Sequence, residues 1–473
     1  MTSPTCSSQK SNTKPKPKSL ADLPTEVIEE IVLDVCPIYR PDALEMPGVR
    51  PEGRDRQEKR SSDDFWLKER VNDLKRLLRT CKALYEAANP LLYRCPFILS
   101  GPMLKSYVAP PEKTVIRKLT QLLRTLEEAP MLADLAVAFF CEDPAWVALD
   151  NHLRQSAVRV GLPVPDEDAD VEDIPVVSLA RLVLAGLPRA RSLTMISGFY
   201  PMINPGGKIR LESLKSLVVS STSPAGARPV RIGVGMPNLR TLCLRGARER
   251  DDPDIGGLMG GRPLRHLTRL VVDVDWTTPS ALPFMSSHVA RLERFAYKTD
   301  ELGPACPLIP VASDTALVEA LAQRCAGSLR TLCLDVGERQ RAGSAAPSFT
   351  LFCKLEDVWI KSDVVVDSGR GTAEGPQLGI WSLPPSLRRL HVKVNSSRRG
   401  VERQGDTVNG GSIEGKYSAI LNEWLTTKVA EGAYPALEEL AISDYTCPQE
   451  IADEVSELGI KLLEDVDLFP LLW

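Results

Sequence analysis

The chain has 473 residues, too many for one ordinary hydrophobic core, so it predicts either several domains or an extended repeat structure. Its net charge of −4 gives no electrostatic reason to expect a nucleic acid or a membrane as partner. The 11 cysteines form no CxxC pair, and only four histidines accompany them, so no zinc site is predicted. Several cysteines, such as Cys243, Cys325 and Cys333, fall in leucine-type segments. We expect them to be small buried groups in a reducing compartment.

Residues 1–19 predict a disordered basic tail. They are polar and contain Lys10, Lys14, Lys16 and Lys18 among serines and prolines, without the apolar centre of a signal peptide. The lysines are also compatible with a weak nuclear signal. No run of about 18 apolar residues predicts a membrane span. We therefore expect a cytoplasmic or nuclear protein, or one found in both places.

Two amphipathic helices are predicted next, within a helical domain at 20–100. The first follows Pro24, which suits the first helical position, and its apolar residues recur on one face. Residues 40–64 are rich in charge, proline and glycine and predict a flexible insertion. The second helix is predicted over Phe65–Ala88, with Asn89-Pro90 as its stop and a short strand at Phe97–Leu99.

One pattern returns from residue 116 to the end of the chain: a helix, a turn and then Leu-x-x-Leu-x-Leu. The clearest copies begin at Leu239 and Leu329, and consecutive copies are often about 24–28 residues apart. Other copies begin at Leu214, Leu267, Leu292, Leu355, Leu387 and Leu437, with weaker ones at Leu132 and Ala190. Stacked copies would share one core, with a parallel sheet on one face and helices such as Ala316–Cys325 and Tyr417–Val429 on the other.

The predicted fold is thus α/β: a small α-helical module followed by an irregular solenoid over 116–473. Its loops are predicted at 163–175, 246–262 and 395–415, where acidic residues, or glycines and charges, accumulate. A helix at Gln449–Leu458, then Gly459 and a strand at Ile460–Leu463, would cap the stack. The repeats lack the Asn or Cys that usually follows such strands, since Ala247 stands there in one clear copy. For that reason we expect an irregular solenoid.

The helical part resembles the F-box-like domain of fungal proteins. The resemblance lies in Leu23-Pro24-x-Glu26-Val-Ile-x-x-Ile31, then Leu77-Leu78-Arg-Thr-Cys81 and Asn89-Pro-Leu-Leu-Tyr-Arg94. Together with the repeats, the chain resembles F-box/leucine-rich-repeat substrate receptors. This resemblance implies a Skp-type adaptor and a cullin–RING (SCF) E3 ubiquitin ligase as partners, with an unknown protein substrate. The positions that match adaptor-binding or fold residues are Leu23, Pro24, Ile28, Ile31, Leu77, Leu78 and Cys81.

Two alternatives remain open from sequence. The Ile28/Ile31 face is either an adaptor surface or core, and the protein is either a ligase subunit or a repeat-based scaffold without ubiquitin-ligase association. Substrate binding is expected at strand positions that face away from the leucine core: Arg269, Arg294, Trp359, Arg389, His391 and Lys393. No nucleophile motif, metal-binding motif or phosphate loop is present, so neither an enzyme nor a cofactor is predicted.

Overall fold

The computed structural model describes residues 23–35, 72–98, 111–143, 151–159, 179–197, 211–221, 236–245, 264–273, 289, 291–298, 314–335, 348–361, 383–393, 424–429, 431–443 and 449–464. The predicted tail at 1–19, the insertion at 40–64 and the loops at 163–175, 246–262 and 395–415 lie outside these residues.

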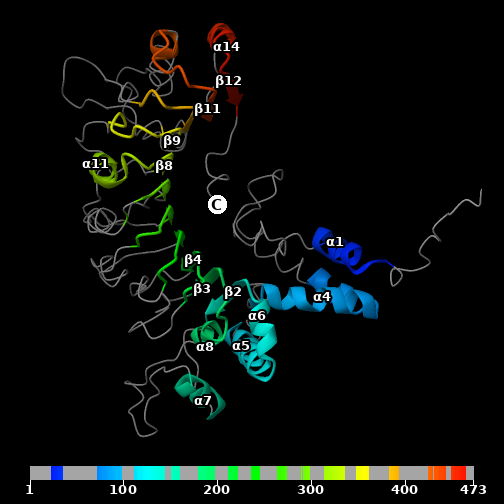
Figure 1. The fold of residues 1–473 in the computed structure, drawn as a ribbon. Coiled ribbons are helices and arrows are strands. Elements are labelled where there is room, and N and C mark those ends of the chain that lie inside the picture. Colours follow the sequence, from blue (N-terminus) through cyan, green and yellow to red (C-terminus); the bar gives the residue numbers. More distant parts are fainter. Residues whose placement is uncertain are drawn as a thin grey trace, which may run out of the picture.

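An open sheet of twelve parallel strands dominates the described residues, and its strands stand in chain order from β1 to β12 (Figure 1). This confirms the predicted parallel sheet, in which each repeat contributes one strand. The strands are β1 Phe97–Ile98, β2 Ala138–Asp143, β3 Ser192–Ser197, β4 Ser216–Ser221, β5 Thr241–Arg245, β6 Arg269–Asp273, β7 Arg294–Lys298, β8 Thr331–Asp335, β9 Asp357–Lys361, β10 Arg389–Lys393, β11 Glu439–Ser443 and β12 Lys461–Glu464.

Helices accompany both ends of the sheet and some of its connections. They are α1 Thr25–Val35, α4 Lys82–Arg94, α5 Pro111–Glu128, α6 Pro130–Leu135, α7 Asn151–Arg159, α8 Leu179–Ala185, α11 Asp314–Cys325, the π-helical segment Leu425–Val429 and α14 Gln449–Glu457. Helix α14 and β12 form the predicted last unit, joined at Gly459, whose φ of 77° favours glycine. Among the described helices, none is long and apolar enough to cross a membrane.

Most repeats place four side chains in the core at the same spacing. In the repeat of β5 these are Met236, Leu239, Leu242 and Leu244, all buried. The Leu239 amide donates to the Met236 carbonyl at 3.3 Å, which turns the chain into the strand. The same turn recurs at Leu211–Leu214, Leu264–Leu267 and Tyr434–Leu437. One leucine-type set therefore fixes both the turn and the strand that follows it.

The inner row of the sheet shows why the stack holds together. Its members are in register on neighbouring strands and are fully buried: Leu193, Leu217, Leu242, Leu270, Phe295, Leu332, Val358, Leu390 and Leu440. Burying each such side chain contributes roughly 1.5–3 kcal/mol. A single repeat cannot bury its own set, so the neighbouring repeats stabilise one another.

The weak copy at Leu132–Val137 was predicted in the wrong register. Residues 130–135 form helix α6, and strand β2 begins only at Ala138. The buried positions are Ala133, Ala136, Phe139 and Cys141, which have the spacing of the other repeats. Small residues and a phenylalanine replace the leucines in this repeat. The leucine pattern therefore matched Leu132 and Leu135 instead, and Leu135 is 39% exposed.

The second predicted helix, Phe65–Ala88, is also different in the structure. Residues 72–77 are helical, but Thr80 Oγ1 donates to the Leu77 carbonyl at 2.7 Å, and Cys81 is extended, which ends the helix. Helix α4 then starts at Lys82 and continues past the predicted stop at Pro90. Proline costs α4 one backbone hydrogen bond, but Leu91 and Leu92 after it pack on the core of the helical module, which favours continuation.

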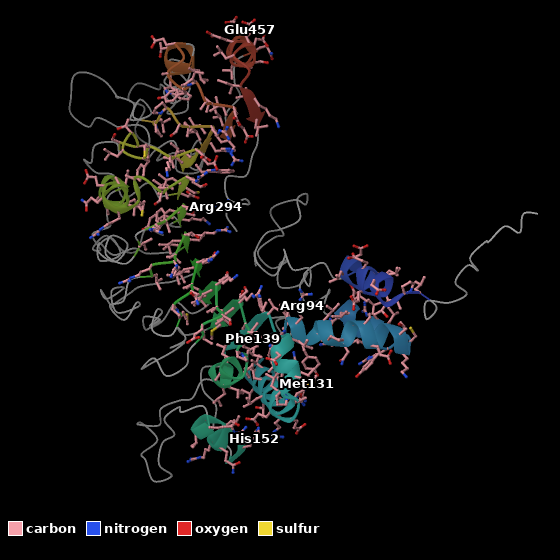
Figure 2. All side chains as sticks on the ribbon, in the orientation of Figure 1. Arg94, Met131, Phe139, His152, Arg294 and Glu457 are labelled. Atoms are coloured by element: carbon pink, nitrogen blue, oxygen red, sulfur yellow. The ribbon has the colours of Figure 1, made fainter. Side chains whose placement is uncertain are left out.

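Helices α1 and α4 form a module that leads directly into the sheet. Ile28, Val32, Leu74 and Leu84 are among its buried core residues. Helix α4 ends at Arg94, three residues before β1 begins, and the Arg94 carbonyl accepts from the Val137 amide at 2.9 Å. Figure 2 shows Arg94 at this junction. The module is thus fixed to the first strands without a long linker.

Candidate functional sites in the helical module and on the outward face of the sheet

The predicted adaptor-binding residues divide into core and surface positions. Ile28 is buried, so of the two alternatives for the Ile28/Ile31 face, Ile28 belongs to the core. Leu23, Leu77, Leu78 and Cys81 are half-buried and pack on the same core. Ile31 is half-buried, and Pro24 is exposed at the start of α1, where its carbonyl accepts from the amides of residues 27 and 28.

Large apolar side chains remain exposed on this module. Val27 on α1 is 42% exposed and Tyr85 on α4 is 49% exposed. Pro24, Val27 and Ile31 recur at three- and four-residue spacing, which places them on one side of α1. The module therefore buries one side of α1 and leaves an apolar strip beside it available for a partner.

The outward face of the sheet, opposite the leucine core, carries a second apolar row. This middle row consists of Val218, Cys243, Val271, Ala296, Cys333 and Trp359, which are buried and in contact. The expected burial of Cys243 and Cys333 is therefore confirmed. Trp359, which was expected to bind substrate at the outward face, is instead buried in this row, because these side chains stack from strand to strand at about 4.8 Å and cover one another.

Trp359 and His391 extend this row across β9 and β10. Their rings are stacked, with centroids 3.7 Å apart and planes at 6°. The two residues are only 3% and 1% exposed, so His391, which was expected to bind substrate at the outward face, is a buried ring. Burial, and next the charge of Arg389, lower the pKa of His391 to about 4. His391 Nε2 lies 3.1 Å from Glu439 Oε1, but the ring is neutral near pH 7 and neither ring nitrogen has a hydrogen-bond partner among the described residues.

A charged cluster flanks the stacked rings. Arg389 Nε and Nη2 donate to the two carboxylate oxygens of Asp357 at 2.6 and 2.7 Å. Thr331 Oγ1 also donates to Asp357 Oδ2, at 3.2 Å. The hydrogen bonds with Asp357 raise the pKa of Arg389 above its already high ordinary value. This arrangement holds the guanidinium in one orientation at the border of the Trp359–His391 stack.

The sheet register shows which predicted substrate-binding residues come together. Trp359 stands beside His391, and Arg389 is two residues before His391 on the same strand. Arg269 and Arg294 are neighbours on β6 and β7, three strands or more from Arg389. Lys393 stands opposite Lys361. The predicted set therefore forms two groups rather than one continuous site.

Sequence reasoning missed Asp357 and Thr331 as partners, and it missed the middle row as a packed feature. One signal was present for the row: the position between the last two leucines of the pattern is apolar in Val218, Cys243, Val271, Ala296 and Cys333. An alternating strand with one solvated face would carry polar residues there. This apolar position could have predicted that the middle row is buried. The pairing of Asp357 with Arg389 could not be predicted in this way, because it depends on the register between β9 and β10.

One cluster of serine, histidine and glutamate needs a chemical assessment. Ser156 Oγ donates to Glu127 Oε1 at 2.6 Å, and Arg159 Nη1 lies 3.0 Å from the same oxygen. His152 Nε2 lies 3.5 Å from Glu127 Oε2 (Figure 2 labels His152 on α7). The Ser156 hydroxyl donates its hydrogen bond to the Glu127 carboxylate and not to the His152 imidazole. The cluster therefore lacks the nucleophile–base pair that an activated serine requires. Its contacts tie α7 to α5. No group of three potential metal ligands occurs in the described parts of the chain.

Comparison with known protein families finds no family model that matches the chain, and comparison with curated proteins finds no significant match. Functional assignment therefore depends on the motifs and on the geometry described above.

Proposed function

We propose that the protein is the substrate-recognition subunit of an SCF-type (cullin–RING) E3 ubiquitin ligase, with an F-box-like module and an irregular leucine-rich-repeat solenoid. The observation that carries the proposal is the direct connection of the helical module to the first strand of a parallel repeat sheet. A receptor must hold its substrate at a fixed position relative to the ligase, and this short junction supplies a rigid link.

The adaptor surface in this proposal is the apolar strip on α1 together with the exposed Tyr85. Val27 and Tyr85 are large apolar groups that the module itself does not bury. A stable interface covers on the order of 1,600 Å² in total, and buried apolar and aromatic anchors dominate its energy. The half-buried Leu77 and Leu78 extend the same apolar character to the turn before α4.

The substrate surface in this proposal is the outward face of the sheet. Trp359, His391 and the Asp357–Arg389 pair give it a rigid aromatic and charged centre. Arg294 and Arg389 are exposed beside the middle row and are available to a protein partner. Arginine is among the residue types that most often dominate protein interfaces.

Co-purification with the host's Skp-type adaptor tests this function. The Val27→Asp and Tyr85→Asp variants change exposed side chains, so the module should stay folded. We expect either variant to reduce recovery of the adaptor by about tenfold or more, since a charge replaces an apolar anchor. Val158→Asp is a matched control, because Val158 is an exposed valine on α7, outside the helical module.

Equal adaptor recovery by wild type, Val27→Asp and Tyr85→Asp would contradict the proposed adaptor surface. A wild-type protein that does not bind the adaptor, yet keeps a stable partner through its repeats, would select the alternative of a repeat-based interaction scaffold. Circular dichroism of each variant shows whether the helical module is intact.

A further inference from the structure

The last strand of the sheet, β12, has one edge that no strand among the described residues covers. On its other side it pairs in parallel with β11, with Glu439 opposite Lys461 (Figure 1). In a parallel sheet, successive residues direct their backbone groups to alternate sides of the strand. The Lys461 amide donates toward β11, to the Glu438 carbonyl at 2.9 Å. The amide and carbonyl of Leu462 therefore point to the free edge.

Both faces of the sheet end at this edge with leucines that are incompletely covered. Leu462 stands beside Leu440 of the inner row, and Leu463 stands beside Ala441 on the outward face. Leu440 and Ala441 are fully buried, whereas Leu462 and Leu463 are only half-buried. Leu458, in the turn between α14 and β12, is 47% exposed. One more strand beside β12 would cover these leucines in the way that β12 covers Leu440 and Ala441.

A row of charges indicates what the added strand should carry. The first residues of β9 to β12 are in register and are Asp357, Arg389, Glu439 and Lys461. The sign alternates at each step, so Arg389 and Glu439 have an opposite charge on either side. Lys461 is exposed, has Glu439 on one side only, and forms no ion pair within the part of the chain that the structure describes. A carboxylate at the matching position of a further strand would continue the alternation.

Lys461 also determines which strands are excluded from this edge. A lysine on an edge strand opposes pairing with an uncharged apolar strand, because its charge would lose water without gaining a counterion. A strand with an acidic residue removes this cost and is therefore selected. A second copy of the chain does not supply that residue. Two β12 strands pair antiparallel about a two-fold axis, and within β12 this sets Lys461 opposite Lys461 or Leu463 of the other copy.

From these observations we infer that the free edge of β12 is a docking site for an extended segment of a protein partner. The segment adds a strand parallel to β12, with an acidic residue opposite Lys461 and apolar residues opposite Leu462 and Leu463. Main-chain hydrogen bonds hold such a segment, and its side chains provide the specificity. The required pattern is that of β11 itself, Glu439-Leu-Ala-Ile442, which meets the other side of β12.

This docking site is separate from the two surfaces of the proposed function. The helical module leads into β1, at the opposite end of the strand order from β12. The free edge presents backbone groups in the plane of the sheet, whereas the proposed substrate surface is the outward face of the sheet. The edge can therefore bind a third protein whether or not the adaptor is bound, and the inference does not depend on the proposed function.

Fluorescence anisotropy with the full-length protein tests the docking site. The probe is a labelled β-hairpin peptide, closed by a disulfide to lower the cost of ordering it, whose free strand reads Ser-Glu-Leu-Ala-Ile-Ser. Its twin carries lysine in place of the glutamate. We expect the wild type to bind the glutamate probe about fivefold or more tightly than the lysine twin, and the Lys461→Glu variant to reverse this preference.

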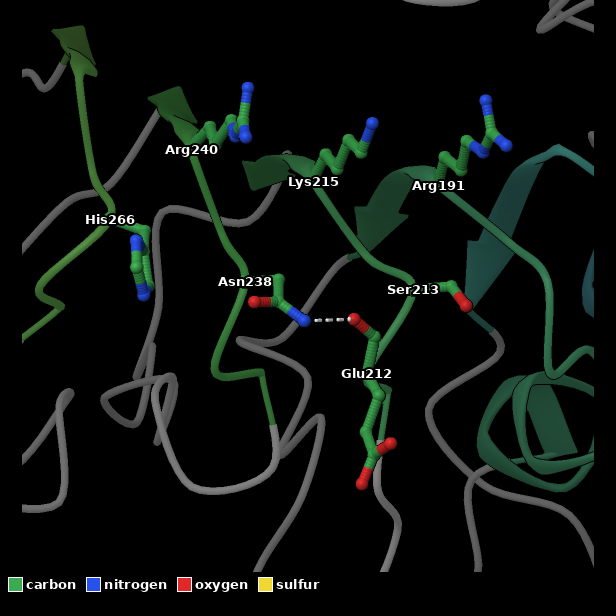
Figure 3. Close-up of a pocket in the computed structure, with 7 residues that line it drawn as sticks. All are labelled: Arg191, Glu212, Ser213, Lys215, Asn238, Arg240 and His266. Carbon is green, nitrogen blue, oxygen red and sulfur yellow. Dashed lines mark hydrogen bonds between the residues drawn. The ribbon is translucent and has the colours of Figure 1, made fainter.

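Lys215→Glu is the matched control variant. Lys215 is also an exposed lysine at the start of a strand, but its strand, β4, is paired on both edges. Lys215 lies between Arg191 and Arg240 (Figure 3), so this variant also detects binding of the acidic probe to these basic side chains. We expect Lys215→Glu to keep the wild-type preference for the glutamate probe.

Five results would overturn the inference. The first three are no binding of the glutamate probe at a protein concentration of about 100 μM, equal affinity for the two probes, and equal effects of the two lysine variants. The fourth is undiminished binding of a probe that is N-methylated on the amides of its free strand. The fifth is a dimer of the protein alone that Lys461→Glu dissociates, because a second copy would then occupy the edge. Both lysines are exposed, and unchanged melting curves verify folding.

Discussion

The pair of Asp357 and Arg389 gives the sharpest prediction for stability. In the Arg389→Ala variant, Asp357 loses two charge-assisted hydrogen bonds of 2.6 and 2.7 Å and keeps only that from Thr331. Hydrogen bonds to charged groups contribute about 1.5–3 kcal/mol. The Asp357 side chain is 11% exposed but that of Arg389 is 46% exposed, so solvent screens part of the interaction. We expect a loss of about 2 kcal/mol.

The neighbouring residue provides the control. Arg388 pairs with Glu438 through one contact of 3.3 Å, and both side chains are more than half exposed. Arg388→Ala should therefore change the free energy of unfolding by no more than about 0.5 kcal/mol. The assay is urea unfolding followed by circular dichroism, with equal dependence on denaturant required for the comparison.

A double variant tests the mechanism rather than the magnitude. Asp357→Ala/Arg389→Ala should be no less stable than Arg389→Ala alone, because removing the carboxylate also removes a charge that is costly to leave unpaired. Equal stability of the Arg389→Ala and Arg388→Ala proteins would refute the argument that this hydrogen-bonded pair differs from an ordinary surface ion pair.

Two further predictions concern pH and repeat register. The pKa of His391 is about 4 in the fold and 6.5 ordinarily, so the unfolded chain binds more protons between these values, and stability falls as the pH drops through this window. Relative to His391→Phe, the wild type should lose about 2 kcal/mol of unfolding free energy between pH 7.5 and pH 5. Unfolding curves that shift in parallel with pH for both proteins would argue against a buried neutral His391 beside Arg389, Asp357 and Glu439. In the repeat of β2, Phe139→Ala should cost about 3–5 kcal/mol and Leu135→Ala less than about 1 kcal/mol, whereas a larger loss for Leu135→Ala would support the register read from leucines alone.

Much of the sheet was predictable because the leucine pattern specifies one repeat completely. Leu239, Leu242 and Leu244 determine a turn and a strand by local spacing, and the same spacing places strands at β4 and at β6 to β11. The pattern failed where other residues fill the same positions. Ala133, Ala136, Phe139 and Cys141 bury as well as leucines do, but they do not form a leucine signal.

The candidate sites were harder to predict because they depend on lateral contacts between repeats. Asp357 and Arg389 are 32 residues apart, and only the register of β9 with β10 brings them together. The same holds for Arg191, Lys215 and Arg240, which directly precede β3, β4 and β5. They become neighbours only through the backbone hydrogen bonds between these adjacent repeats. In the helical module, Ile28 and Val27 are adjacent on an amphipathic helix. Packing against α4 buries Ile28 and leaves Val27 exposed.

The central claim, that this is an adaptor-bound substrate receptor, is tested most directly by binding between the purified wild-type protein and the purified Skp-type adaptor. Isothermal titration calorimetry should give a one-to-one complex with a dissociation constant of about 1 μM or below, as a largely apolar interface of standard size allows. Heats indistinguishable from dilution at adaptor concentrations of about 100 μM, with a folded protein, would contradict the claim.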